Sequence, residues 1–149
     1  MRRTRVAIVA GFALFFFLGI AVLLARGLSG SGAERGAVLE VLRAEAGGDA
    51  EAVLARLPAC RREPACALTT RERVAELRRD GDVEILNYRP SVTLALTRRI
   101  GTGRVAWRAG TGLPVVQCVR VRREGPLTGG AVELLSISAP IGGEEGCTE

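Results

Sequence analysis

The first apolar pattern along the chain is an uninterrupted run over residues 6–25, VAIVAGFALFFFLGIAVLLA, without a charged side chain. A helix of this length is about 30 Å long, which matches the hydrocarbon core of a bilayer. Arg2, Arg3 and Arg5 precede the run, so the positive-inside rule places residues 1–5 in the cytoplasm and the rest of the chain outside. The pattern predicts a single-pass protein of the cell membrane whose residues 6–25 contact the lipid bilayer.

A cleaved secretory signal peptide is the alternative to a retained anchor. The apolar region of such a peptide is usually about 7–15 residues long and ends at a small-x-small site. The run here is longer, and Leu23 with Ala25 makes a poor site, although Ser31 to Ala33 fits better. Under both interpretations the C-terminal domain is extracytoplasmic. Residues 26–32 are rich in Gly and Ser and predict a flexible tether.

Helical spacing then dominates the pattern as far as residue 81. Apolar positions recur at helical intervals in residues 33–46, and Gly47-Gly48 ends that helix. Asp49 is in position to cap a second, short helix that ends at Pro58. A loop between Cys60 and Cys66 follows, and Thr69 opens a third helix that ends at Gly81.

From residue 82 the apolar period changes to two, which predicts β-strands. Strands are expected over 83–85, 92–96, 104–108, 115–122 and 131–139. If Arg104 lies opposite Arg120 in the central hairpin, one face carries four apolar side chains and the other carries Cys118 and four arginines. The apolar set is Val105, Trp107, Val119 and Val121, and the arginines are Arg104, Arg108, Arg120 and Arg122.

One apolar and one solvated face is typical of an antiparallel sheet covered by helices on one side. The expected fold class is therefore α+β: an N-terminal transmembrane helix, then about three short helices on one face of an antiparallel sheet of about five strands. The extracytoplasmic domain covers residues 33–149.

The segment GAVLEVLRAEAGGDAEAVLARL, a helix, a Gly-Asp turn and a second helix, resembles the opening of small exported domains of the nuclear transport factor 2-like superfamily. The hairpin RVAWR…LPVVQCVRVRR is similar to the curved sheet of these domains, and the resemblance covers roughly residues 33–139. It implies a pocket but no particular activity. Catalytic members use Asp, His or Tyr in the cone, whereas this chain has no histidine and a single tyrosine, Tyr88.

The charged composition excludes several kinds of chemistry. All 21 basic residues are arginine, because the chain has neither lysine nor histidine. This removes Ser-His and Cys-His activation of a nucleophile, Schiff-base chemistry and the phosphate-binding lysine of Walker-type loops. Four of the 21 flank the apolar run, which leaves 17 arginines against 16 acids in residues 27–149. That balance does not indicate nucleic-acid binding.

The four cysteines, Cys60, Cys66, Cys118 and Cys147, predict structural disulfides, because an even count in a small exported domain is typical of them. Zinc binding and redox catalysis are the alternatives, but the paired C-x-x-C motif that either favours is absent. Cys60–Cys66 with Cys118–Cys147 is the simplest pairing. The two pairings with longer loops remain open.

Arg104, Arg108, Arg120 and Arg122 are the candidate contacts for an anionic surface, since like charges facing each other favour an anionic partner. The alternative is a solvated face balanced by acids such as Glu133. For Trp107 we expect a core position, with the wall of a ligand pocket as the alternative.

The remaining chemical motifs are weak. The glycine-rich segments at 101–103 and 110–112 do not open a helix, so they predict turns. Asp80, Asp82 and Glu84 are expected in solvent, and Ser136 and Ser138 have no visible base. The sequence thus predicts no catalytic, cofactor-binding or metal-binding residue. We expect a membrane-anchored, extracytoplasmic accessory or protein-interaction domain whose protein partner the sequence does not identify. The alternative is a small-molecule or lipid carrier of nuclear transport factor 2-like type.

Overall fold

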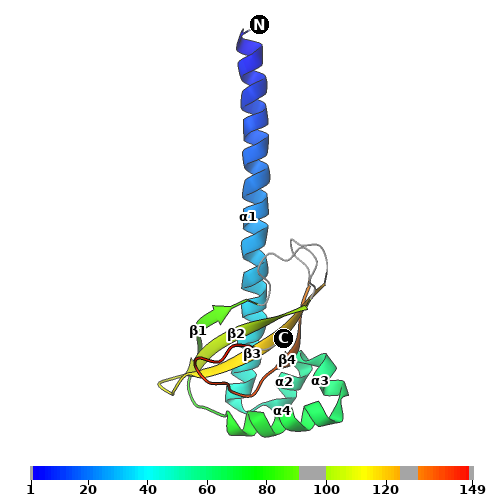
Figure 1. The fold of residues 1–149 in the computed structure, drawn as a ribbon, viewed down its shortest axis with the longest axis vertical. Helices are drawn as coiled ribbons and strands as arrows, with labels where there is room; N and C mark the ends of the chain where they lie inside the picture. Colours follow the sequence, from blue (N-terminus) through cyan, green and yellow to red (C-terminus); the bar gives the residue numbers. More distant parts are fainter. Residues whose placement is uncertain (1, 91–99, 125–130, 148–149) are drawn as a thin grey trace.

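The computed structural model describes residues 2–90, 100–124 and 131–147, and within these ranges four helices precede four strands (Figure 1). The helices are α1 (Arg2–Gly47), α2 (Ala50–Arg56), α3 (Pro58–Arg62) and α4 (Pro64–Glu76), and the strands are β1 (Val83–Arg89), β2 (Ile100–Ala109), β3 (Val115–Glu124) and β4 (Ala131–Ile137). The α+β character that the change of period predicts is confirmed.

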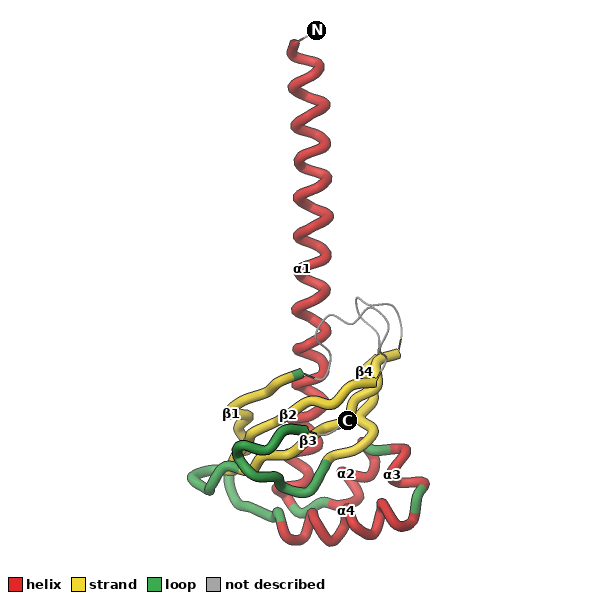
Figure 2. The backbone as a smooth tube through the Cα atoms, in the orientation of Figure 1, coloured by secondary structure: helices red, strands yellow, loops and turns green. Residues whose placement is uncertain are grey.

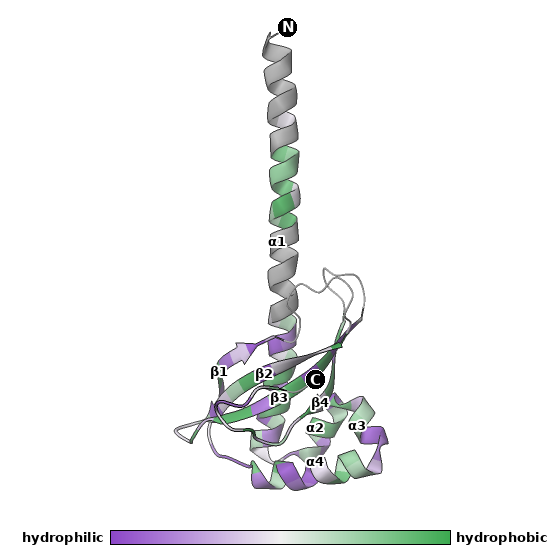
Figure 3. Ribbon diagram, in the orientation of Figure 1, coloured by the Kyte–Doolittle hydropathy of each residue, from purple (hydrophilic) through white to green (hydrophobic). Residues whose placement is uncertain are grey.

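Helix α1 is one continuous helix of 46 residues, and its N-terminal part extends away from the sheet (Figure 1). Residues 26–32, predicted as a tether, belong to this helix. Apolar side chains between Leu14 and Val22 are exposed, and Figure 3 shows this stretch in green. The C-terminal part of α1, by contrast, packs against the rest of the domain.

The prediction of a membrane-spanning helix is wrong. Among the described residues, no helix combines the length and the apolarity that crossing a bilayer requires. The predicted single-pass topology and cell-membrane location, with a cytoplasmic N-terminus, depended on that helix and are wrong with it.

The short helices differ in their boundaries from the sequence prediction. Asp49 caps α2 as expected, and its carboxylate accepts a 2.9 Å hydrogen bond from the backbone N–H of Ala52. However, Pro58 begins α3 and Pro64 begins α4, so the loop predicted between the first two cysteines is helical except at Glu63. Proline suits the first helical turn because the N–H it lacks has no partner there. Thr69, predicted to open the third helix, lies inside α4.

The strands form one antiparallel sheet in the order β1-β2-β3-β4, with helices on one of its faces (Figure 2). About five strands were expected, and the described residues contain four. The strand predicted at residues 92–96 lies outside the described residues. β1 contains a bulge between Ile85 and Asn87, where its pairing with β2 shifts by one residue.

The core lies between the sheet and the helices. Val38, Val41 and Leu42 of α1 are at most 1% exposed, and they share this layer with Trp107 and Val105 of β2, both fully buried. The prediction that Trp107 is a core residue is confirmed. Because a buried aromatic side chain removes a large apolar area from water, this layer supplies much of the stability of the domain.

Two disulfides fix the periphery of the domain. Cys60–Cys66 joins α3 to α4, with 5.2 Å between the Cα atoms. Cys118–Cys147 joins β3 to the C-terminal tail, with 5.7 Å between the Cα atoms. This is the simplest of the three pairings that the sequence left open. The tail crosses the face of the sheet opposite α1 (Figure 2).

Candidate functional site

The four predicted arginines all lie on the face of the sheet that the helices leave uncovered, which we call the outer face. On β2 and β3, buried side chains alternate with more exposed ones, and the arginines occupy the more exposed positions. The predicted register is wrong by two residues, because Arg104 lies opposite Cys118 and Thr102 lies opposite Arg120. A shift by an even number of residues keeps every side chain on its face, so the composition of the two faces is confirmed.

Three of the four arginines have partners within the protein. Arg108 forms a 2.9 Å ion pair with Glu84 of β1, and Arg122 forms a 3.0 Å ion pair with Glu133 of β4. The guanidinium of Arg104 donates to the backbone carbonyl of Gly143 in the C-terminal tail. The four arginines lie on one face as predicted, but these three are engaged within the protein.

Arg120 is different, because it has neither an ion-pair nor a hydrogen-bond partner among the described residues, and its side chain is exposed. On the adjacent strands it lies between Thr102 of β2 and Ser136 of β4, each directly opposite it in the register. We call these three residues the Thr102–Arg120–Ser136 row. A free guanidinium between two hydroxyls is a potential site for an anionic group.

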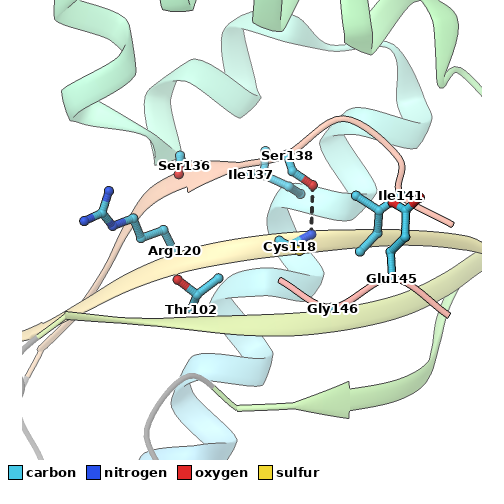
Figure 4. Close-up of a pocket in the computed structure, with 9 residues that line it drawn as sticks. All are labelled: Thr102, Cys118, Arg120, Ser136, Ile137, Ser138, Ile141, Glu145 and Gly146. Atoms are coloured by element: carbon cyan, nitrogen blue, oxygen red, sulfur yellow. Dashed lines mark hydrogen bonds between the residues drawn. The ribbon is translucent and has the colours of Figure 1, made fainter. Parts of the chain in front are cut away.

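The row lines a cleft of about 640 Å³, which we call the outer cleft (Figure 4). The remaining lining residues come from β3, from the end of β4 and from the tail; they are Cys118, Ile137, Ser138, Ile141, Glu145 and Gly146. In Figure 4, Arg120 and Glu145 lie at opposite ends of the cleft, with Cys118 between them. The cleft is thus polar at both ends, with charges of opposite sign.

The C-terminal tail forms one wall of the outer cleft and is fastened at several points. The backbone N–H of Ser138 donates to the Cys118 carbonyl at 2.8 Å, and that of Ile141 donates to the Val116 carbonyl at 2.8 Å. The Ser138 hydroxyl accepts a 2.9 Å hydrogen bond from the Cys118 N–H (Figure 4). Together with the Cys118–Cys147 disulfide, these contacts hold an extended segment across the outer face.

The opposite side of the sheet contains a buried polar network. Arg73 of α4 donates from Nε to Glu45 of α1 at 2.9 Å, and Gln117 of β3 donates to the same carboxylate at 3.0 Å. The indole N–H of Trp107 donates to Gln117 Oε1 at 2.6 Å. Burial raises the pKa of the Glu45 carboxyl, although the charge of Arg73 and the hydrogen bonds from Gln117 and Arg73 lower it. The network joins α1 and α4 to the sheet.

A second buried carboxylate, Glu34, lies nearer the N-terminal side of the domain. Its Oε2 accepts a 2.5 Å hydrogen bond from Arg123 of β3, and its Oε1 accepts one from the hydroxyl of Tyr88 in β1. Burial raises the pKa of the Tyr88 phenol, and the hydrogen bond and charge of Glu34 raise it further. A phenol whose pKa is raised stays protonated and donates a hydrogen bond. These contacts are therefore structural.

Glu34, Glu45, Arg73 and Gln117 were missed by the sequence prediction. A signal for the two glutamates was present, since Glu34, Val38, Val41 and Glu45 recur at helical spacing on the buried stripe of α1. A charged residue on an apolar stripe indicates a buried ion with a partner. Nothing in the sequence, however, indicates that Arg73 and Gln117 supply those partners.

The other chemical candidates stay apart from the outer cleft. Glu84 pairs with Arg108, and the sequence around Asp80 and Asp82 leads into β1 without lining the cleft. The glycines at 101–103 lie within β2 rather than in a turn, which corrects that prediction, whereas those at 110–112 follow β2 in a turn as expected. Across the part of the chain that the structure describes, no cluster of acids or cysteines is arranged to hold a metal ion.

No family model, curated protein or solved structure matches the chain. The resemblance to nuclear transport factor 2-like domains therefore stays a prediction.

Proposed function

We propose that the protein is a non-catalytic interaction domain that binds a partner protein across the outer face of its sheet. The observation that carries this proposal is the outer cleft, whose wall is a tail fastened by the Cys118–Cys147 disulfide. Its volume of about 640 Å³ lies within the ordinary range for binding sites, about 300–1,000 Å³.

The chemistry of the cleft favours binding over catalysis. General acid–base catalysis needs a titrating group held near the reacting atoms, most often histidine, which the chain lacks. The cleft offers hydroxyls of Thr102, Ser136 and Ser138, but Ser138 is already engaged with β3. The two buried glutamates belong to networks on the far side of the sheet. The cleft can therefore recognise a ligand through charge and hydrogen bonds without an activated nucleophile.

The alternative of a small-molecule or lipid carrier has less support. A carrier of the nuclear transport factor 2-like type would use the side of the sheet that the helices cover. That side is filled by Trp107, Val105 and Val121, which are fully buried, and by Val119 at 1% exposure. A packed layer of this kind stabilises the domain and leaves these side chains in contact with one another.

A photo-crosslinking residue at Ile141, which lines the cleft, tests the proposal. In cells that produce the full chain, we expect a discrete crosslinked species that contains one partner protein. The matched control places the same residue at Glu72 of α4, which is exposed and does not line the cleft, and should give no such species. Equal adducts at both positions, or none at Ile141, would refute the assignment.

A further inference from the structure

We propose that the outer cleft binds a carboxylate group, held by the guanidinium of Arg120 between the hydroxyls of Thr102 and Ser136. The inference rests on the proposed function in taking the outer cleft as the binding surface, and it names the chemistry that the cleft recognises.

The register of the sheet builds this site. Thr102 and Ser136 lie directly opposite Arg120 on its two sides, and side chains opposite each other on antiparallel strands have Cβ atoms about 4.5–5.5 Å apart. All three residues line the cleft. A guanidinium offers N–H donors in a fork that matches the two oxygens of a carboxylate, and a hydroxyl on each side adds a further donor.

The surrounding charges favour a group with a single negative charge. Next along the strands, Arg122 is neutralised by Glu133, and Arg104 keeps its charge while donating to a carbonyl. Of the residues that line the cleft, Arg120 and Glu145 carry a charge, and they lie at its opposite ends (Figure 4). A carboxylate balances the single positive charge of Arg120. A dianionic phosphate would leave one negative charge uncompensated in the same cleft as Glu145.

Arg120 has no evident structural role that would explain its position. Its side chain is exposed, and the described residues offer it no ion pair or hydrogen bond. Arg108 and Arg122, on the same two strands, are each paired with a glutamate of an edge strand. The residue opposite Arg120 on β4 is a serine instead of a glutamate. The guanidinium is thus left available in a cleft rather than neutralised within the sheet.

Benzoate and benzamide are a matched pair of probes, since they share one shape and differ in charge. In a titration followed by the amide NMR signals of Thr102, Arg120 and Ser136, we expect saturable shifts with benzoate. Benzamide should bind at least about tenfold more weakly, because it forfeits a charge-assisted hydrogen bond. Equal affinities for the two probes, or no saturation with benzoate, would overturn the proposal.

Substitutions identify the residue responsible. Arg120→Gln should weaken benzoate binding at least about tenfold, and Arg120→Lys, which keeps the charge but loses the fork, should fall between that variant and the wild type. Ser136→Ala should weaken binding severalfold. Arg108→Gln is the control, because Arg108 shares the face but is paired and does not line the cleft. Wild-type affinity in Arg120→Gln would refute the assignment to this row.

A tripeptide with a free C-terminal carboxylate, compared with its amide, distinguishes the source of the group. Tighter binding of the tripeptide acid than of benzoate assigns the site to the C-terminus of a partner chain, whereas tighter binding of benzoate assigns it to a free small-molecule acid. The crosslink at Ile141 separates this inference from the proposed function. If benzoate fails to bind but the crosslink forms, the carboxylate site is wrong and the interaction face stands.

Discussion

An Arg–Glu ion pair lies on each side of the sheet, buried on one side and exposed on the other. On the helix-covered side, Arg73 and Glu45 lie 2.9 Å apart with their side chains 10% and 0% exposed. On the outer face, Arg108 and Glu84 also lie 2.9 Å apart, but their side chains are 44% and 61% exposed. The distance is the same, so the difference in energy between the two pairs comes from the solvent around them.

A buried pair and an exposed pair behave differently when one partner is removed. Inside the protein, the remaining charge has lost its water and keeps no compensation, which costs several kcal/mol. At the surface, water replaces the lost partner, and the effect is usually below about 1 kcal/mol. The buried Arg73 therefore maintains the fold, whereas the exposed pair of Arg108 and Glu84 contributes little to it.

The largest effect is expected at Trp107, which is fully buried and bonded to Gln117. Trp107→Ala should lower the free energy of unfolding by about 3–5 kcal/mol, because it creates a cavity and removes the donor to Gln117. Urea denaturation measures the change, and Arg120→Gln on the outer face is the control that should leave stability unaltered. A well-folded alanine variant of near wild-type stability would contradict the packing described above.

Arg73→Met tests the buried ion pair and should cost about 3–5 kcal/mol, since it leaves Glu45 charged and buried without its partner. The double variant Glu45→Leu with Arg73→Met should cost less than Arg73→Met alone, because no unpaired charge remains. Both values come from urea denaturation. If the double variant loses more free energy of unfolding than the two single variants together, the network contributes more to stability than the pairing of these two charges.

Removal of the Cys118–Cys147 disulfide, by replacing both cysteines with alanine, should cost about 2–4 kcal/mol. The bond closes a loop between residues 29 positions apart and holds the tail against the outer face. The variant should also lose benzoate affinity, since the tail forms a wall of the cleft. Unchanged affinity with reduced stability would show that the tail contributes only to the fold.

The pH dependence of stability should depend on Glu45, whose carboxyl pKa is raised above its ordinary value by burial. A carboxyl with a raised pKa binds its proton more tightly in the folded state, so its contribution to stability decreases as pH rises through the folded-state pKa. The wild type should therefore lose stability relative to Glu45→Gln as pH rises above about 4.3, the value for an unperturbed glutamate. Denaturation of both proteins over a pH series gives the sign, and a difference that grows in the opposite direction would mean that Arg73 outweighs burial.

The smallest effect is expected for Arg108→Gln, which breaks the exposed pair with Glu84. The stability should change by less than about 1 kcal/mol. Thermal denaturation at low and high salt is the measurement, and the small difference should shrink further as salt screens the charges. A loss as large as that of Arg73→Met would remove the contrast between the two sides of the sheet.

The pattern of the sequence determined which side chains share a face. Alternation along β2 and β3 placed Trp107 and Val105 inside and Arg104 and Arg120 outside, and this survived an error of two residues in the register. A period-two pattern is insensitive to an even shift. The even number of cysteines predicted disulfides but left three pairings open, and the structure decided between them.

Local sequence patterns were less reliable predictors where the same residue types are compatible with two different structures. Proline after a helix ends it or begins the next one, and here Pro58 begins α3. A long apolar run is compatible with a membrane-spanning helix and with a helix that does not span. Among the described residues, no helix is long and apolar enough to span. Gly and Ser in residues 26–32 favour a tether, but these residues continue α1.

The sequence by itself determined the α+β class, the apolar and polar faces of the central hairpin, and the core position of Trp107, because these depend on periods that a single chain displays. Only the tertiary structure decided which of the four outer-face arginines lacks a partner among the described residues. It is Arg120, because the register sets it opposite Ser136, whereas Arg122 is set opposite Glu133. The same register joins Thr102 to the row, and the tail closes the cleft beside it. Such relations link residues far apart in the chain, and they follow from strand pairing rather than from any local pattern.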